Sequence, residues 1–181
     1  DATYNFTVTQ TDLASNTSTS TAQQWIRDTV APSAPTITSP AASPTYSNGS
    51  NLTISGGCVT GHTVNLAGDA TDSTTCASSA YSFSVTKNTD ATYNFTVTQT
   101  DLASNTSTST AQQWIRDTVS PSAPTITSPA SSPTYTNGSN LTISGACETA
   151  ATVALAGDAT DSVTCAGSAY SFTVTKNIDA T

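Results

Sequence analysis

The sequence predicts an all-β fold made of tandem β-sandwich modules, with about seven strands in each module. Three observations predict it: hydrophobic residues alternate with polar ones in short runs, turn residues separate these runs, and the whole pattern recurs after 89 residues. The abundance of Thr and Ser suits the solvated face of a strand. It disfavours helices, because β-branched side chains lose freedom there and hydroxyls compete for backbone hydrogen bonds.

The 89-residue repeat is the strongest signal in the chain. Residues 1–30 and 90–119 are identical, and only 12 of the 92 positions that overlap at this shift differ. The period exceeds the roughly 20–50 residues of a solenoid repeat and suits one independently folded sandwich. Near-identity between neighbouring copies favours a longer array of the same module.

Alternation of period two marks the strands within one period. The predicted strands lie at residues 36–38, 52–55, 64–66, 81–86, 93–98 and 107–116. The side chains expected to point into the core of the complete module are Ile37, Leu52, Ile54, Val64, Leu66, Tyr81, Phe83, Val85, Tyr93, Phe95, Val97 and Ile115. About seven short strands over roughly 90 residues are typical of an immunoglobulin-like sandwich.

Two segments with paired prolines, residues 28–35 and 117–124, are predicted to be linkers, because proline lacks the donor that a central strand needs. The complete module is therefore expected at 29–117. Residues 1–28 are interpreted as the last two strands of a preceding module, and 118–181 as the first five strands of a following one. Either a longer array supplies the missing strands, or chains complete each other head to tail. The longer array is the favoured explanation.

The cysteines lie at one spacing in both periods, which favours pairing within each module. We expect the disulfides Cys58–Cys76 and Cys147–Cys165. Each disulfide would stabilise its module by about 3 kcal/mol in the chain-entropy model, because it closes a loop in the unfolded chain. Structural disulfides indicate an oxidising compartment, so the protein is expected outside the cytosol.

Composition excludes several classes of function. The net charge of −8, with only four basic residues, argues against a nucleic-acid partner. No apolar run approaches the roughly 18 residues of a membrane span, and any export signal is expected outside this segment. No enzyme is expected, because no catalytic motif is present and the single histidine, His62, is replaced by Ala151 in the next period.

Several motifs recur in a fixed order: Asp-Thr-Val-Ala-Pro at 28–32, Leu-Thr-Ile-Ser-Gly at 52–56, Tyr-Ser-Phe-Ser-Val at 81–85 and Thr-Asp-Leu-Ala-Ser-Asn at 100–105. Together they resemble the bacterial immunoglobulin-like repeats of large surface adhesins and biofilm-associated proteins. The resemblance implies an extracellular or cell-surface stalk or fibre, whose partners are neighbouring modules of the same or an adjacent chain. The alternatives are a module that binds a host or matrix glycan or protein, and a filament subunit that assembles by strand completion.

The resemblance also implies a calcium site, because related adhesins coordinate Ca²⁺ between modules through an acidic loop and a linker aspartate. The matching residues are Asp101, Asn105 and Asp117, repeated as Asp12, Asn16 and Asp28. Oxygen ligands suit Ca²⁺, which takes six to eight of them. The favoured interpretation is nevertheless a turn cap in which Asp and Asn bond the local backbone.

Four further features carry weaker expectations. Asp69 and Asp72, like their repeats Asp158 and Asp161, are interpreted as solvated turns rather than a cation or acid–base site. Lys87 and Lys176 are expected to be solvated at strand ends rather than cross-linked. Trp25 and Trp114 are expected to pack beside the proline linkers, with ligand contact as the alternative. Tyr93, three residues after Asp90, looks like a tyrosine corner.

Overall fold

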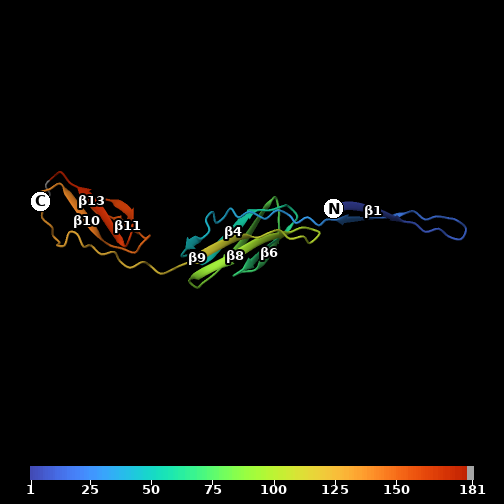
Figure 1. Ribbon diagram of the computed structural model, residues 1–181, viewed down its shortest axis with the longest axis horizontal. Coiled ribbons are helices and arrows are strands. Elements are labelled where there is room, and N and C mark those ends of the chain that lie inside the picture. Colours follow the sequence, from blue (N-terminus) through green and yellow to red (C-terminus); the bar gives the residue numbers. More distant parts are fainter. Residues whose placement is uncertain (179–181) are drawn as a thin grey trace. The chain divides into compact units, whose positions relative to one another are not determined.

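The structure is a computed structural model and describes residues 1–178 (Figure 1). Thirteen strands and no helix lie in that range, so the all-β prediction is confirmed. The chain divides into two compact units, Asp1–Thr118 and Val119–Thr181. The strands of the first unit are β1 (Ala2–Val8), β2 (Thr21–Arg27), β3 (Thr45–Ser47), β4 (Asn51–Gly57), β5 (Thr63–Gly68), β6 (Asp72–Thr75), β7 (Ala80–Thr86), β8 (Ala91–Thr100) and β9 (Thr110–Arg116). Across residues 1–178 no helix has the length and hydropathy of a membrane span.

Strands β3 to β9 form two sheets, which we call the central module. The larger sheet has the order β3-β9-β8-β5-β6, and the smaller one pairs β4 with β7. All neighbours are antiparallel except β3 and β9, which run parallel. Leu66 lies opposite Val97 in the larger sheet, and Leu52 lies opposite Val85 in the smaller one.

One hydrophobic core joins these two sheets. Along β7 the aromatic and apolar residues Tyr81, Phe83 and Val85 are buried while the serines between them are exposed, as the alternation predicts. The buried members of the core are Leu52, Ile54, Val64, Leu66, Cys76, Tyr81, Phe83, Val85, Phe95, Val97 and Trp114. Each large side chain contributes about 1.5–3 kcal/mol on burial, so this cluster is the main source of the module's stability.

The strand predicted at residues 36–38 is not formed. This segment runs beside β4, where the amides of Thr36 and Thr38 donate to the carbonyls of Gly57 and Ser55 at 3.0 and 2.9 Å. Only one isolated bridge, between Ser39 and Ser55, is made, because prolines flank the segment and interrupt the ladder. Strand β3, which the alternation did not mark, lies on the edge of the larger sheet instead.

The inward face of the last strand was also predicted wrongly. Strand β9 begins at Thr110 rather than at residue 107, and it buries Gln112 and Trp114 while Ile115 stays half-buried outside the core cluster. The pairing of Tyr93 with Trp114 places the tryptophan on the core face. Gln112 is tolerated there because its amide nitrogen donates to the carbonyl of Ala42 at 2.9 Å.

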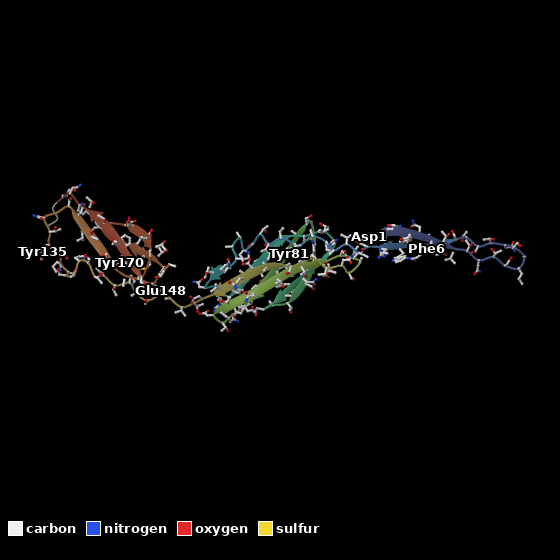
Figure 2. The ribbon with its side chains drawn as sticks, in the orientation of Figure 1. Asp1, Phe6, Tyr81, Tyr135, Glu148 and Tyr170 are labelled. Carbon is white, nitrogen blue, oxygen red and sulfur yellow. A yellow bond between two sulfur atoms is a disulfide. The ribbon has the colours of Figure 1, made fainter. Side chains whose placement is uncertain are left out.

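Strands β1 and β2 form a separate two-stranded hairpin. Its sequence is that of β8 and β9, and its register is the same, with Tyr4 opposite Trp25. Every residue of both strands is exposed. Figure 2 labels Phe6 on this hairpin, where it is 50% exposed, whereas the equivalent Phe95 is 1% exposed. The same residues therefore lack a second sheet to cover them.

The second unit contains four strands among its described residues, not the five predicted. They are β10 (Asn140–Ala146), β11 (Thr152–Leu155), β12 (Asp161–Thr164) and β13 (Ala169–Thr175). Strand β10 pairs with β13 and β11 with β12, as β4 pairs with β7 and β5 with β6. Its core is small: Val153, Cys165, Tyr170 and Phe172 are buried. Residues 125–127, which correspond to the predicted strand at 36–38, form no strand either.

Candidate functional site

The loop at residues 101–105, between β8 and β9, holds the first candidate site. One carboxylate oxygen of Asp101 accepts hydrogen bonds from the amides of Ala103 and Asn105, at 2.8 and 2.9 Å. The other accepts from the side-chain amide of Asn105 at 3.0 Å. The Asn105 side chain, followed by these backbone amides and the nearby His62, lowers the pKa of Asp101. The carboxylate therefore stays charged and caps the turn.

The equivalent loop in the hairpin has the same geometry. Asp12 accepts from the amides of Ala14 and Asn16 at 2.9 and 2.8 Å, and from the Asn16 side chain at 2.8 Å. The Asn16 side chain and then its amide lower the pKa of Asp12. Because this loop forms without a core beneath it, its shape comes from its own sequence.

The linker before the central module touches the Asp101 loop. The side-chain amide of Asn105 donates to the carbonyl of Asp28 at 3.2 Å, and the Asp28 carboxylate accepts from the amide of Val30 at 3.0 Å. A shallow pocket of about 300 Å³ lies here, lined by Ile26, Asp28, His62, Asp101, Leu102 and Ala103. At His62, Nδ1 is buried and makes no hydrogen bond to the described residues.

The predicted calcium ligands do not all come together. Asp101 and Asn105 meet Asp28, whereas Asp117 follows β9 at the end remote from this loop, where its amide donates to the Ser47 carbonyl at 3.1 Å. Within residues 1–178, no three His, Cys, Asp or Glu side chains lie close enough to hold a metal ion. The arrangement favours the turn cap, and calcium binding stays a prediction.

The second acidic loop connects two strands of the larger sheet. The Asp69 carboxylate accepts from the Asn94 amide at 2.6 Å, and the Asp69 amide donates to the Asn94 carbonyl at 2.9 Å. Lys87 donates to the Asp69 carbonyl and lies 5.0 Å from the centre of the Tyr93 ring. Asp69 therefore ties the end of β5 to β8, and Lys87 has a packing role there.

The disulfides connect the two sheets of a module. Cys58 follows β4 of the smaller sheet and bonds Cys76, which follows β6 of the larger sheet; Cys147 and Cys165 form the equivalent bond. All four cysteines are paired in the arrangement that the repeat predicts. Cys76 lies in the core, so the disulfide connects the two sheets at the core.

Two tyrosine hydroxyls of the central module make structural hydrogen bonds. Tyr93 donates to the carbonyl of Thr89 at 2.8 Å, which is the bond expected of a tyrosine corner. Tyr81 donates to the carbonyl of Thr36 at 2.9 Å, and its burial raises the pKa of this hydroxyl to about 12. Both bonds hold linker or turn backbone against a strand.

Sequence reasoning missed Gln99. Its side chain is 1% exposed, accepts from the amide of Val59 at 2.9 Å and donates to the carbonyl of Ser33 at 2.6 Å. It thus joins β8 to the linker and to the segment after β4. Its position in the strand could have predicted this burial, because Gln99 continues the alternation that points Phe95 and Val97 inward.

No protein-family model matches this chain, and no curated protein sequence matches it either. The likeness to adhesin repeats is therefore an interpretation of its motif order.

Proposed function

We propose that this chain is a structural repeat segment of an extracellular stalk or surface fibre, built from immunoglobulin-like sandwiches in series. The observation that carries the proposal is that one 89-residue period contains all seven strands β3 to β9, whose buried side chains form one core. A self-contained unit that repeats almost unchanged suits a spacer, because a spacer needs length and not a unique pocket.

The sandwich interpretation has three supports in the central module. The two sheets share one hydrophobic cluster, the Cys58–Cys76 bond connects them, and the Tyr93 hydroxyl closes a corner before β8. The disulfide joins different positions from the one in antibody domains, so the proposal concerns the general architecture.

The contacts of Asp90 with the residues at and after the end of β9, which we call the Asp90 clamp, favour a stiff junction between the central module and the segment that follows it. The Asp90 carboxylate accepts from the amide and the hydroxyl of Thr118 at 2.9 and 2.7 Å, and it also pairs with Arg116. The same clamp is present one period earlier, where Asp1 accepts from both groups of Thr29. Each period therefore fixes the first residues of its own outgoing linker, and prolines follow in the sequence.

The two disulfides are typical of proteins in an oxidising compartment, which is extracellular or periplasmic in bacteria. Display at a cell surface is part of the proposal and agrees with the acidic, lysine-poor composition.

The test is the length of arrays. Polypeptides with two, four and eight copies of the 89-residue period are measured by small-angle X-ray scattering. The proposal expects the maximum dimension to grow by a constant increment per copy, larger than the roughly 23 Å of a seven-residue strand. Growth that levels off as in a compact globule contradicts the spacer role. Saturable binding of one module on a glycan array would favour the adhesive alternative instead.

A further inference from the structure

We infer that the central module is a load-bearing unit, in which residues 28–47, which we call the entry segment, lie along β9 so that tension shears the two past each other. This inference rests on the proposed spacer function and adds resistance to tension to it. The chain runs on from both ends of the module, so tension along the chain enters the module through the entry segment and leaves it after β9.

The parallel pairing of β3 with β9 sets the direction of the load. Strand β3 ends the entry segment, and Thr45 of this strand lies opposite Trp114 of β9. Tension pulls β3 toward its amino-terminal end and β9 toward its carboxyl-terminal end. In a parallel pair these two directions are opposite, so the strands slide along each other and their hydrogen bonds bear the load together. Antiparallel strands pulled from adjacent ends would instead open one bond at a time.

Further hydrogen bonds extend this parallel contact over most of the entry segment. Their donors come from the loop before β9, from β9 itself and from the residue after it. Donor and acceptor advance in the same direction along the chain. The bonds, donor first, run from Asn105 to Asp28, from Thr110 to Pro35, from Gln112 to Ala42, from Gln113 to Ser43 and from Asp117 to Ser47. Tension therefore acts on five such contacts in addition to the β3–β9 ladder.

Prolines explain why side chains make several of these bonds. The entry segment contains prolines at positions 32, 35, 40 and 44, and proline has no amide hydrogen to donate to a ladder. Two buried glutamines supply donors instead: Gln99 donates to the Ser33 carbonyl at 2.6 Å and Gln112 to the Ala42 carbonyl at 2.9 Å. A hydrogen bond is stronger in the low-dielectric interior than in water, so these two hold the entry segment firmly.

The smaller sheet holds the same segment from its other side. The amides of Thr36 and Thr38 donate to carbonyls of β4, and the Tyr81 hydroxyl donates to the Thr36 carbonyl at 2.9 Å. A Cβ on Gly56 would lie 1.9 Å from the carbonyl oxygen of Thr36, so the entry segment lies directly against β4. Both sheets therefore have to release the entry segment before tension can open the core between them.

The disulfide lies outside this contact. Cys58 and Cys76 belong neither to the entry segment nor to β9, so their bond does not connect the two parts that tension separates. The resistance to tension therefore comes from the non-covalent contacts of the entry segment. Forced unfolding is governed by the unfolding rate, to which a bond that breaks in the transition state contributes in full.

Two matched substitutions test this inference in the 181-residue chain held under constant tension between its ends. Ser43→Ala removes an exposed hydroxyl that accepts from the Gln113 amide at 3.0 Å, between the entry segment and β9. It should raise the unfolding rate of the central module roughly two- to tenfold, the factor for one typical hydrogen bond. Thr60→Ala is the control, because it removes an exposed hydroxyl that accepts from the Ser79 amide at 2.8 Å away from this contact.

The control should leave the unfolding rate under tension unchanged, although urea denaturation should show similar losses of stability for both variants. Both are made in a chain with Cys147→Ala and Cys165→Ala, where the unfolding step of the central module is the one that lengthens when the Cys58–Cys76 bond is reduced. Equal effects of both substitutions on the rate, or no effect of Ser43→Ala, overturn the inference.

A change in the direction of pulling tests the shear geometry without altering the contact. The carboxyl-terminal handle stays in place, and the amino-terminal handle moves to Asn48→Cys, an exposed position just after β3. Tension then acts on the adjacent carboxyl-terminal ends of β3 and β9 and opens their bonds in succession. The rupture force of the central module should fall relative to pulling from the start of the chain. An equal or higher force contradicts the inference.

These results are separable from the spacer role. Repeat arrays that lengthen linearly, together with a rupture force that does not depend on the direction of pulling, refute the load-bearing contact and leave the proposed function standing. Arrays that collapse into a globule, together with the expected effects of Ser43→Ala and of the moved handle, refute the spacer and keep the mechanical role of the entry segment.

Discussion

Trp114 and Trp25 occupy the same position in identical 30-residue segments, yet Trp114 is fully buried and Trp25 is 53% exposed. Each stacks or packs against the tyrosine opposite it, Tyr93 or Tyr4, at centroid distances of 5.6 and 5.2 Å. The local hairpin is therefore the same in both places. What differs is the sheet that covers it, so the burial of this segment is a property of the whole module.

Removing the two indoles should have unequal effects on stability. Trp114→Ala should lower the free energy of unfolding of the central module by about 3–5 kcal/mol, since it leaves a large cavity in the core. Trp25→Ala should change it by less than about 0.5 kcal/mol in dilute solution. Urea denaturation followed by circular dichroism measures both, and equal losses would contradict the assignment of the core.

The disulfides should stabilise each unit separately. Replacing Cys58 and Cys76 by alanine should cost the central module about 3 kcal/mol, because the unfolded chain loses a loop constraint. Replacing Cys147 and Cys165 is the matched control and should leave the central module unchanged.

Force spectroscopy gives an independent readout of the same bond. Reduction should lengthen the extension released by unfolding the central module by about 55 Å, because the 18-residue separation then becomes stretchable, whereas the intact bond holds its two Cα atoms 6.0 Å apart. An unchanged extension on reduction would show that the bond does not form.

The Asp90 clamp should make stability depend on acid pH. Hydrogen bonds from the hydroxyl and then the amide of Thr118, with the charge of Arg116, lower the pKa of Asp90 in the folded state. A lowered folded-state pKa contributes stability above the unfolded value near 3.9, and that contribution disappears as the pH falls through the folded pKa. The stability difference between wild type and Asp90→Asn should therefore be present at pH 7 and shrink below about pH 4.

Calorimetry from pH 2 to 7 measures this difference, with Asp1→Asn as the control outside the central module. A difference that is constant over the whole range would contradict the clamp.

Calcium should have little effect on the melting temperature if the Asp101 loop is a turn cap. Its carboxylate already accepts three hydrogen bonds within the loop, and Asp117 lies elsewhere. The melting temperature should therefore be the same in EDTA and in millimolar Ca²⁺. A rise with calcium that Asp101→Asn and Asp28→Asn both abolish would restore the calcium site between linker and loop.

Local patterns in the sequence predicted most of the fold. Alternation placed Phe83, Val85, Phe95 and Val97 on the core face, and the repeat selected the cysteine pairs. Both signals are local or periodic, so they can be read without knowing which strands are neighbours.

Features that depend on distant partners could not be predicted in this way. Strand β3 exists because Thr45 to Ser47 pair in parallel with β9, about 70 residues later in the chain. The register of β9 with β8 determines that Trp114 faces the core. Hydrophobicity alone predicted the opposite face of β9, with Ile115 pointing inward. Of the candidate site, the Asp101 turn cap was predicted, whereas the contact of Asn105 with Asp28 needed the fold.

The most direct test of the account is acrylamide quenching of two single-tryptophan chains. Trp25→Phe reports on Trp114, and Trp114→Phe reports on Trp25; the second change breaks no hydrogen bond among the described residues, because Nε1 of Trp114 makes none. In dilute solution, Trp114 should be strongly shielded and Trp25 readily quenched. Equal quenching of both indoles would contradict the claim that the central module alone provides a complete core for this segment.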